Sequence, residues 1–432
     1  MKKTKLRKEA CLTTLLALAA SLGLSPMTVL AADPPTPEER MKQLEELVKQ
    51  QNSKLDSQEN RIKQMEGRAE ALGVSLTNPQ PNKVLTLLDG VTLSGYAEAS
   101  YIYSTAKNPG RAVVGRSFDR LDDQFSLNGV KLTLQRPVST NDWDAGFRVD
   151  LLYGQNATLI QSSGLSLGNQ GDIEQAYAEF NVPIGHGLNV KLGKMVTLMG
   201  VEVIEDPTNP NWSEGNQFLF AENFTSTGIQ LGYKWNDMFD SQLFVNNGWD
   251  VVADNNRGKS FMGRLGITLD PKTVVGLVGY AGPEQANNSS AWRKGINVVV
   301  SRAVCDKFKV WGQFDYGRED ANSALPKPKK DADWIAGGLW ATYDFTPKWG
   351  IALRADYFND RDGARTSLAP STAPFPLNTH NEFESYTLTL NCRQWSNLIL
   401  RPEIRLDHSS VSKAFGDSRD QFTVGMSAAY LF

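Results

Sequence analysis

The most regular feature of this chain is an alternation of apolar and polar side chains with a period of two residues, which recurs from residue 91 onward. In the segment 261–269, Phe261, Leu265 and Ile267 share one parity, whereas Arg264 has the other. Successive side chains of a β-strand point to opposite faces, so this pattern predicts strands with one apolar and one polar face.

The polar face of the predicted strands carries charges. A charged side chain costs about 2–4 kcal/mol on the lipid side at the centre of a bilayer, so charges opposite a continuous apolar face are expected to face a wet interior. A solvated outer face of a soluble protein is the alternative interpretation. The candidate wall residues are Lys131, Arg148, Asp150, Arg264, Arg354, Asp356, Arg401, Glu403 and Arg405.

Short and long connections alternate between the predicted strands. Seven short turns, such as Asn236-Asp237, alternate with eight longer polar segments, among them 200–223 and 283–292. This count gives about sixteen strands, and single-chain outer-membrane barrels have an even number of strands with short turns at one end. The fold class predicted for residues 91–432 is therefore all-β, a transmembrane antiparallel up-and-down β-barrel, rather than a soluble sandwich.

The last predicted strand supports this membrane interpretation. Phe422, Val424, Met426, Tyr430 and Phe432 share one parity, and the two terminal aromatic residues fit a girdle at a membrane interface. This ending resembles the C-terminal strand of bacterial outer-membrane β-barrels, which close on a terminal Phe.

The residues before the barrel predict three further segments. Residues 1–31 combine a basic start, an apolar run too short to span a bilayer and an A-x-A-like site, as in a secretory signal peptide. Residues 32–66 contain a Pro-rich leader and a heptad repeat from residue 38, which predicts an α-helical coiled coil in the periplasm, or alternatively a single solvated helix. Residues 67–90, with their Gly and Pro, are predicted to form a linker.

Composition excludes several classes of function. The formal net charge is −3 and becomes more negative without the basic signal peptide, which argues against nucleic acid as a partner. The three histidines have no spacing typical of a metal site, so no metal or cofactor is expected. Matches to a nucleophile elbow at 164–168 and to a phosphate loop at 253–260 lack the required following helix, so no catalytic residue is predicted.

Two cysteines follow the signal peptide, Cys305 and Cys392. The predicted strands place them about four strands apart, beyond the ~7 Å between Cα atoms that a disulfide tolerates. Two free thiols are therefore expected.

The segment 200–223 contains five acidic residues and no Lys or Arg. It is the third long loop, and it resembles in position and sign the loop that folds inward in general porins. Facing Lys131, Arg148 and Arg264, such a loop would form a constriction with a mild preference for cations. The alternative is an acidic loop exposed outside the cell. The candidate constriction residues are Glu202, Glu205, Asp206, Glu214 and Glu222.

Several motifs together resemble a known family. They include the runs FSLNGVKLTLQRP, GFRVDLLYGQNA, QAYAEFNVP and NNGWD, all between residues 91 and 280. They are similar to the OmpL-like family of bacterial outer-membrane β-barrel porins. The resemblance implies an outer-membrane channel for small solutes and brings no catalytic residues. The heptads are also similar to those of phosphate-selective trimeric porins.

The sequence therefore predicts a homotrimeric porin, held in outer-membrane lipid with its N-terminal helix in the periplasm, through which small hydrophilic solutes diffuse passively. A lipase-like barrel enzyme is the first alternative, because His380 and His408 lie in or beside predicted outer loops. A non-conducting adhesin or envelope tether is the second.

Overall fold

The computed structural model describes residues 90–432 except 109–110, 117, 166–167, 169, 323–329 and 369–378, together with Glu46 and Lys49, which are helical. The predicted signal peptide, coiled coil and linker therefore lie almost wholly outside the described residues and stay predictions. Val91–Phe432 form one compact unit.

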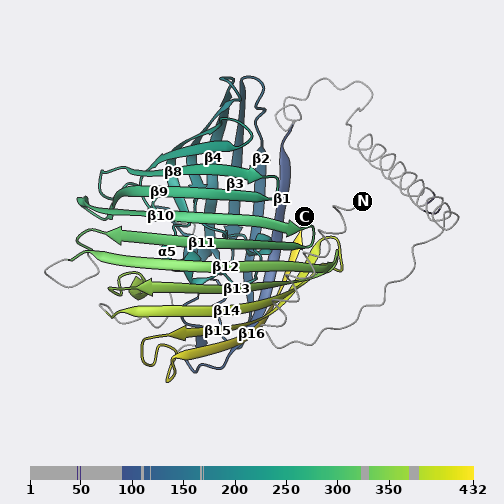
Figure 1. The fold of residues 1–432 in the computed structure, drawn as a ribbon, viewed down its shortest axis with the longest axis vertical. Helices are drawn as coiled ribbons and strands as arrows, with labels where there is room; N and C mark the ends of the chain where they lie inside the picture. The colour runs from purple at the N-terminus through teal and green to yellow at the C-terminus, as the bar shows by residue number, and fades with distance from the viewer. Residues whose placement is uncertain are drawn as a thin grey trace. The chain divides into compact units, whose positions relative to one another are not determined.

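The described residues of this unit form sixteen antiparallel strands that close into a barrel. Each strand pairs with its neighbours in sequence, and β1 pairs with β16 through a register that includes Tyr96 opposite Leu431 (Figure 1). The predicted fold class is confirmed for the barrel. The strands are β1 (Thr92–Ser104), β2 (Gln124–Arg136), β3 (Asp144–Tyr153), β4 (Gly171–Val182), β5 (Leu188–Val196), β6 (Thr225–Lys234), β7 (Phe239–Asn246), β8 (Ser260–Asp270), β9 (Thr273–Gln285), β10 (Asn288–Cys305), β11 (Phe308–Glu319), β12 (Ala332–Thr346), β13 (Trp349–Asp360), β14 (Asn381–Cys392), β15 (Leu398–Ser409) and β16 (Asp420–Leu431).

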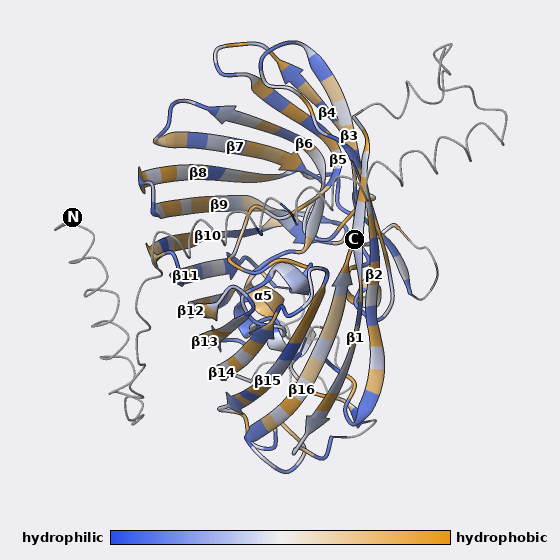
Figure 2. Cartoon of the chain, turned by 90° about the vertical axis from the view of Figure 1, so that its right-hand side faces the viewer, coloured by the Kyte–Doolittle hydropathy of each residue, from blue (hydrophilic) through white to orange (hydrophobic). Residues whose placement is uncertain are grey.

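The alternation along each strand separates the two faces of the barrel. In β16, Phe422 and Met426 are exposed, whereas Thr423 and Ser427, which have the opposite parity, are buried. Apolar and polar bands accordingly alternate along the strands in Figure 2. The outer face is thus apolar, as a lipid-facing surface requires.

One predicted loop is wrong. The segment 283–292 is not a free polar loop, because β9 and β10 continue through most of it as a hairpin that turns at residues 286–287. Asn287 adopts the positive φ of 58° that such a turn needs. The polar side chains there have partners: the Glu284 carboxylate accepts hydrogen bonds from Trp249 N at 2.7 Å and from Ser260 Oγ at 2.7 Å. Polar composition therefore does not distinguish this hairpin from a loop.

The loop between β5 and β6, residues 197–224, enters the barrel and carries the 3-10 helix η2 (Asp206–Thr208) and the short helix α5 (Asn216–Ala221). Helix α5 packs against β11, β12, β13 and β14 from the inside (Figure 2). Two further short helices, α4 (Ala157–Ile160) and η3 (Thr366–Leu368), lie in other long loops. None of the helices within the described residues is long and apolar enough to cross a membrane.

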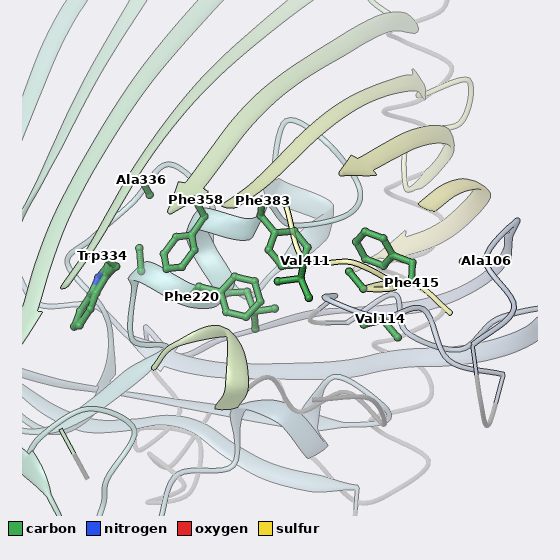
Figure 3. Close-up of a cluster of buried hydrophobic side chains, with 12 residues drawn as sticks. Ala106, Val114, Phe220, Trp334, Ala336, Phe358, Phe383, Val411 and Phe415 are labelled. Carbon is green, nitrogen blue, oxygen red and sulfur yellow. The ribbon is translucent and has the colours of Figure 1, made fainter. Parts of the chain in front are cut away.

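An aromatic cluster fixes α5 against the wall and against other loops (Figure 3). Phe220 of α5 lies 5.3 Å from Phe358 and 5.8 Å from Phe383, measured between ring centroids. Phe415, from the β15–β16 loop, lies 5.9 Å from Phe383. Trp334 of β12 belongs to the same buried cluster. Burial of these rings fills the interior beside β12–β14.

The expectation of two free thiols is wrong for one residue. Cys392 is free and buried, but Cys305 is disulfide-bonded. The two cysteines do not bond to each other, as their separation predicted. That argument concerned only the pairing of Cys305 with Cys392, and the one other cysteine of the sequence, Cys11, lies outside the described residues.

Candidate functional site

Glu202 of the β5–β6 loop is bound to the wall of the lumen. Its Oε1 accepts hydrogen bonds from Arg354 Nη1 at 2.7 Å and Trp340 Nε1 at 3.1 Å, and its Oε2 accepts one from Gly215 N at 2.7 Å. Arg354 also pairs with Asp356, Nε to Oδ2, at 3.0 Å. All three charged side chains are at most 1% exposed, so this ion pair is closed to solvent.

The neighbouring wall residues hold the backbone of the same loop. Glu403 accepts hydrogen bonds from Trp212 N at 2.9 Å and from Ser213 N at 3.1 Å. Arg401 Nη1 donates to the carbonyl oxygen of Asp206 at 2.5 Å, and Arg405 Nη1 donates to that of Glu214 at 2.6 Å. These three wall residues therefore satisfy backbone groups that the irregular loop leaves unpaired, which explains how a loop can lie inside a barrel.

A second cluster forms where the loop meets β2, β3 and β4. Lys131 Nζ lies 2.8 Å from Glu174 and 3.2 Å from Asp150, and it also donates a hydrogen bond to Glu205 of the loop. Arg148 pairs with Asp150 at 3.0 Å.

Oxygens of Asp150, Glu174 and Glu205 lie within 4.8 Å of one another, a spacing that a metal ion could also use. The ammonium group of Lys131 already bonds to all three carboxylates, so the cluster is an ion-pair network.

The side chains of the remaining predicted constriction and wall residues differ in their surroundings. Asp206 and Glu214 are buried within the loop, and Glu222 accepts a hydrogen bond from Gln313 on β11. Gly200 must be glycine, because its φ is +86° and a Cβ there would meet the Glu222 carboxylate at 2.1 Å. Within the described residues Arg264 pairs with Asp240 on the neighbouring strand β7, at 2.5 Å, and not with a carboxylate of the loop.

Sequence reasoning missed several members of these networks. Glu98 pairs with Arg401 at 3.4 Å, and Glu174 belongs to the Lys131 cluster. Asn297 and Gln313 accept hydrogen bonds from backbone N–H groups at the start of the loop, at 3.2 and 2.7 Å. Strand parity could have found Glu98, since it alternates with the apolar residues of β1. The amides have no comparable signal.

The loop thus divides the lumen into two unequal environments. On β13–β15 the charged side chains are buried, with Arg354, Arg401 and Arg405 at 0–1% exposure. On β3–β8 some charges keep contact with solvent, with Arg148 at 29% and Arg264 at 24% exposure, whereas others, such as Asp150 and Lys194, are buried. Solvent therefore reaches part of the charged wall on β3–β8, whereas the loop covers the charged wall on β13–β15.

A closed antiparallel barrel with an apolar outer face and a polar interior defines the class of outer-membrane β-barrel proteins. The chain belongs to the family described as "Putative beta-barrel porin-2, OmpL-like", whose model matches residues 90–432. The resemblance predicted from the sequence motifs is confirmed, and the protein is a porin of the outer membrane.

Solved porin structures share this fold at low sequence identity. An anion-selective porin from Comamonas acidovorans aligns with a TM-score of 0.54 and 11% identity over 79% of this chain and 99% of that chain. The outer membrane channel DcaP of Acinetobacter baumannii aligns with a TM-score of 0.53 and 13% identity over 79% and 97%. OprB of Pseudomonas putida aligns with a TM-score of 0.52 and 12% identity over 81% and 96%. Curated proteins yielded no match to this sequence.

Proposed function

We propose that this porin lets small hydrophilic solutes diffuse passively through its lumen, without catalysis. The observation that carries the proposal is the partly exposed polar wall on β3–β8, where Arg148, Lys191 and Arg264 keep 29%, 26% and 24% of their side chains exposed. Charged side chains in contact with water are typical of porin interiors and make a hydrated path for polar solutes.

The proposal includes a mild cation preference, which depends mainly on Glu205. Glu202 is closed to solvent in its pair with Arg354, so it adds little field to the open part of the lumen. Glu205 keeps 17% of its side chain exposed beside Lys131. Its carboxylate is therefore the constriction residue best placed to attract a passing cation.

We also propose a homotrimer with the N-terminal helix in the periplasm. One solved structure with this fold, OmpT of Vibrio cholerae, is described in a trimer form. The heptads of residues 38–66 would add contacts where three chains meet.

The enzyme alternative is weakened by the surroundings of two histidines. His408 Nδ1 lies 2.7 Å from Asp420, and His380 Nε2 lies 3.0 Å from Asn359. Neither histidine is hydrogen-bonded to a serine or cysteine in the described part of the chain. A hydrolase of this kind needs such a nucleophile next to its base.

The test is ion conduction by the purified full-length protein in planar bilayers. We expect stepwise channel insertion and, in a gradient of potassium chloride near 0.1 M, a zero-current potential that shows mild cation preference. Glu205→Gln should move this potential toward anions, and the effect should fade near 1 M salt, because the Debye length falls from about 10 Å to about 3 Å.

Asp417→Asn is the matched control, because Asp417 is fully exposed in the β15–β16 loop. It should leave the potential unchanged. Equal shifts for both variants would contradict the role of Glu205, and the absence of any current would contradict the channel itself.

A further inference from the structure

A recess in the wall of the lumen is lined largely by apolar side chains. It lies between the inner faces of β8–β11 and the start of the β5–β6 loop, with a volume of about 230 Å³. Its apolar lining consists of Leu198, Val201, Val274, Val278, Val299 and Trp311.

Strand register shows that this lining faces inward. Val278 lies opposite Arg264 on β8 and opposite Asn297 on β10. Asn297 Oδ1 accepts a hydrogen bond from Gly200 N, which belongs to the loop inside the barrel, at 3.2 Å. This row of residues therefore points into the lumen. The other strand residues of the recess pair with the same parity: Val274, Gly276, Val299, Ser301 and Trp311.

Apart from the buried Val278, the apolar residues of the recess are not fully packed. Val274 is 38% exposed, and Val299 and Trp311 are half-buried. The interior of a porin is ordinarily polar. Apolar side chains that face inward and contact water would therefore be stabilised if an apolar ligand covered them. Concave, mostly apolar surfaces with a few polar groups are typical of small-molecule sites.

Arg264 supplies the polar group. Its Nη1 pairs with Asp240 at 2.5 Å, and within the described residues it donates no other hydrogen bond. Gly276 leaves space beside it, because a Cβ there would lie 3.8 Å from Arg264 Nε and 4.0 Å from Nη2. These two nitrogens form the edge of the guanidinium group that binds a carboxylate through two parallel hydrogen bonds.

We propose that the recess binds small organic anions that combine one carboxylate with an apolar body. The carboxylate accepts hydrogen bonds from Arg264 Nε and Nη2, and the apolar body packs on Val274, Val299 and Trp311. The proposal rests on the proposed function, because a solute reaches this recess through the open lumen. Drug-sized ligands need about 300–1,000 Å³, so this recess fits only smaller solutes.

The test compares three probes by calorimetry on the full-length protein purified in detergent. Benzoate has both features, acetate lacks the apolar body and benzyl alcohol lacks the charge. We expect benzoate to bind roughly tenfold more tightly than either of the others, since each feature contributes separately. Equal affinities for benzoate and acetate would overturn the proposal.

Substitutions test separately the contribution of Arg264 and that of the space beside Gly276. Arg264→Gln should weaken benzoate binding about tenfold and leave benzyl alcohol unchanged, because only the charged hydrogen bonds are lost. Gly276→Val should weaken both, because its side chain occupies the space beside Arg264 without meeting backbone. Lys272→Gln, which removes a cation from the β8–β9 turn outside the recess, is the matched control and should change neither.

Unchanged benzoate binding in both Arg264→Gln and Gly276→Val would overturn the site assignment. Calorimetry does not require conduction, so the two proposals fail in different ways. Ion current without a preference for benzoate contradicts the recess alone, whereas benzoate binding by a protein that passes no current contradicts the proposed function alone.

Discussion

At the scale of single residues, the lumen contains buried ion pairs whose members come from distant parts of the chain. Arg354 of β13 binds Glu202 of the β5–β6 loop and Asp356 of its own strand, and all three are closed to solvent. Burial of charges is costly unless each is paired and hydrogen-bonded. These pairs therefore hold the loop in one position more than they stabilise the barrel as a whole.

Substitution of Arg354 should strongly lower the stability of the folded protein. We expect Arg354→Met to lower the free energy of unfolding by about 3–5 kcal/mol, because Glu202 and Asp356 stay buried without their cation. Arg302→Met is the control, since Arg302 and Asp270 are about half exposed and such pairs contribute about 0–1 kcal/mol. Urea unfolding in lipid vesicles measures both, and similar losses for the two variants would contradict this account.

At the scale of elements, the β5–β6 loop decides which part of the lumen solvent can reach. Helix α5 and the aromatic cluster around Phe220 cover the inner face of β12–β14 (Figures 2 and 3). The parity of Arg354 predicts a wet side chain, but the loop covers it. Strand pattern alone thus distinguishes inside from outside and does not distinguish open wall from covered wall.

Cysteine labelling in intact membranes can distinguish three environments: the open wall of the lumen, the wall covered by the loop, and the surface that faces lipid. We expect Arg148→Cys to react readily with a water-soluble maleimide, because Arg148 faces the open wall. Thr389→Cys should react slowly, because Thr389 faces inward beneath the loop and is fully buried. Leu265→Cys should resist labelling because it faces lipid.

The unsubstituted protein serves as the blank in this experiment, because its free Cys392 is buried. Labelling of Thr389→Cys as fast as that of Arg148→Cys would show that the loop does not cover β14.

At the scale of the whole molecule, the barrel is closed by its own strands. The pairing of β1 with β16 completes the ladder within Val91–Phe432 and leaves no unpaired sheet edge. Residues 38–66 are therefore not needed to close the barrel, and their heptads are expected to act between chains.

Deletion of residues 38–66 should leave a barrel that still inserts but forms an oligomer that dissociates more easily on heating. Native mass measurement and gels of heated samples give the oligomeric state. Leu55→Lys is a milder variant that should have the same direction of effect, because it places a charge at a heptad seam. An oligomer of unchanged stability in both variants would indicate that the helix serves another partner.

The sequence by itself determined the class of fold and the two faces of each strand. A period of two is a local property of extended backbone, so Leu265 and Arg264 could be assigned to opposite faces without knowing their neighbours. The number of strands followed from the spacing of turns. The negative charge of the β5–β6 loop could also be predicted from the sequence, since its five acidic residues lie within one segment.

Only the tertiary structure decided which charges meet. Glu202 and Arg354 are 152 positions apart, and no local pattern links them. The polar segment at 283–292 pairs as a hairpin of β9 and β10, and Trp249 and Ser260, from a neighbouring loop and strand, donate hydrogen bonds to its Glu284 carboxylate. The recess beside Arg264 likewise needs four strands and a loop to converge. Contacts of this kind depend on closure of the barrel, which brings distant segments together at distances that sequence spacing does not encode.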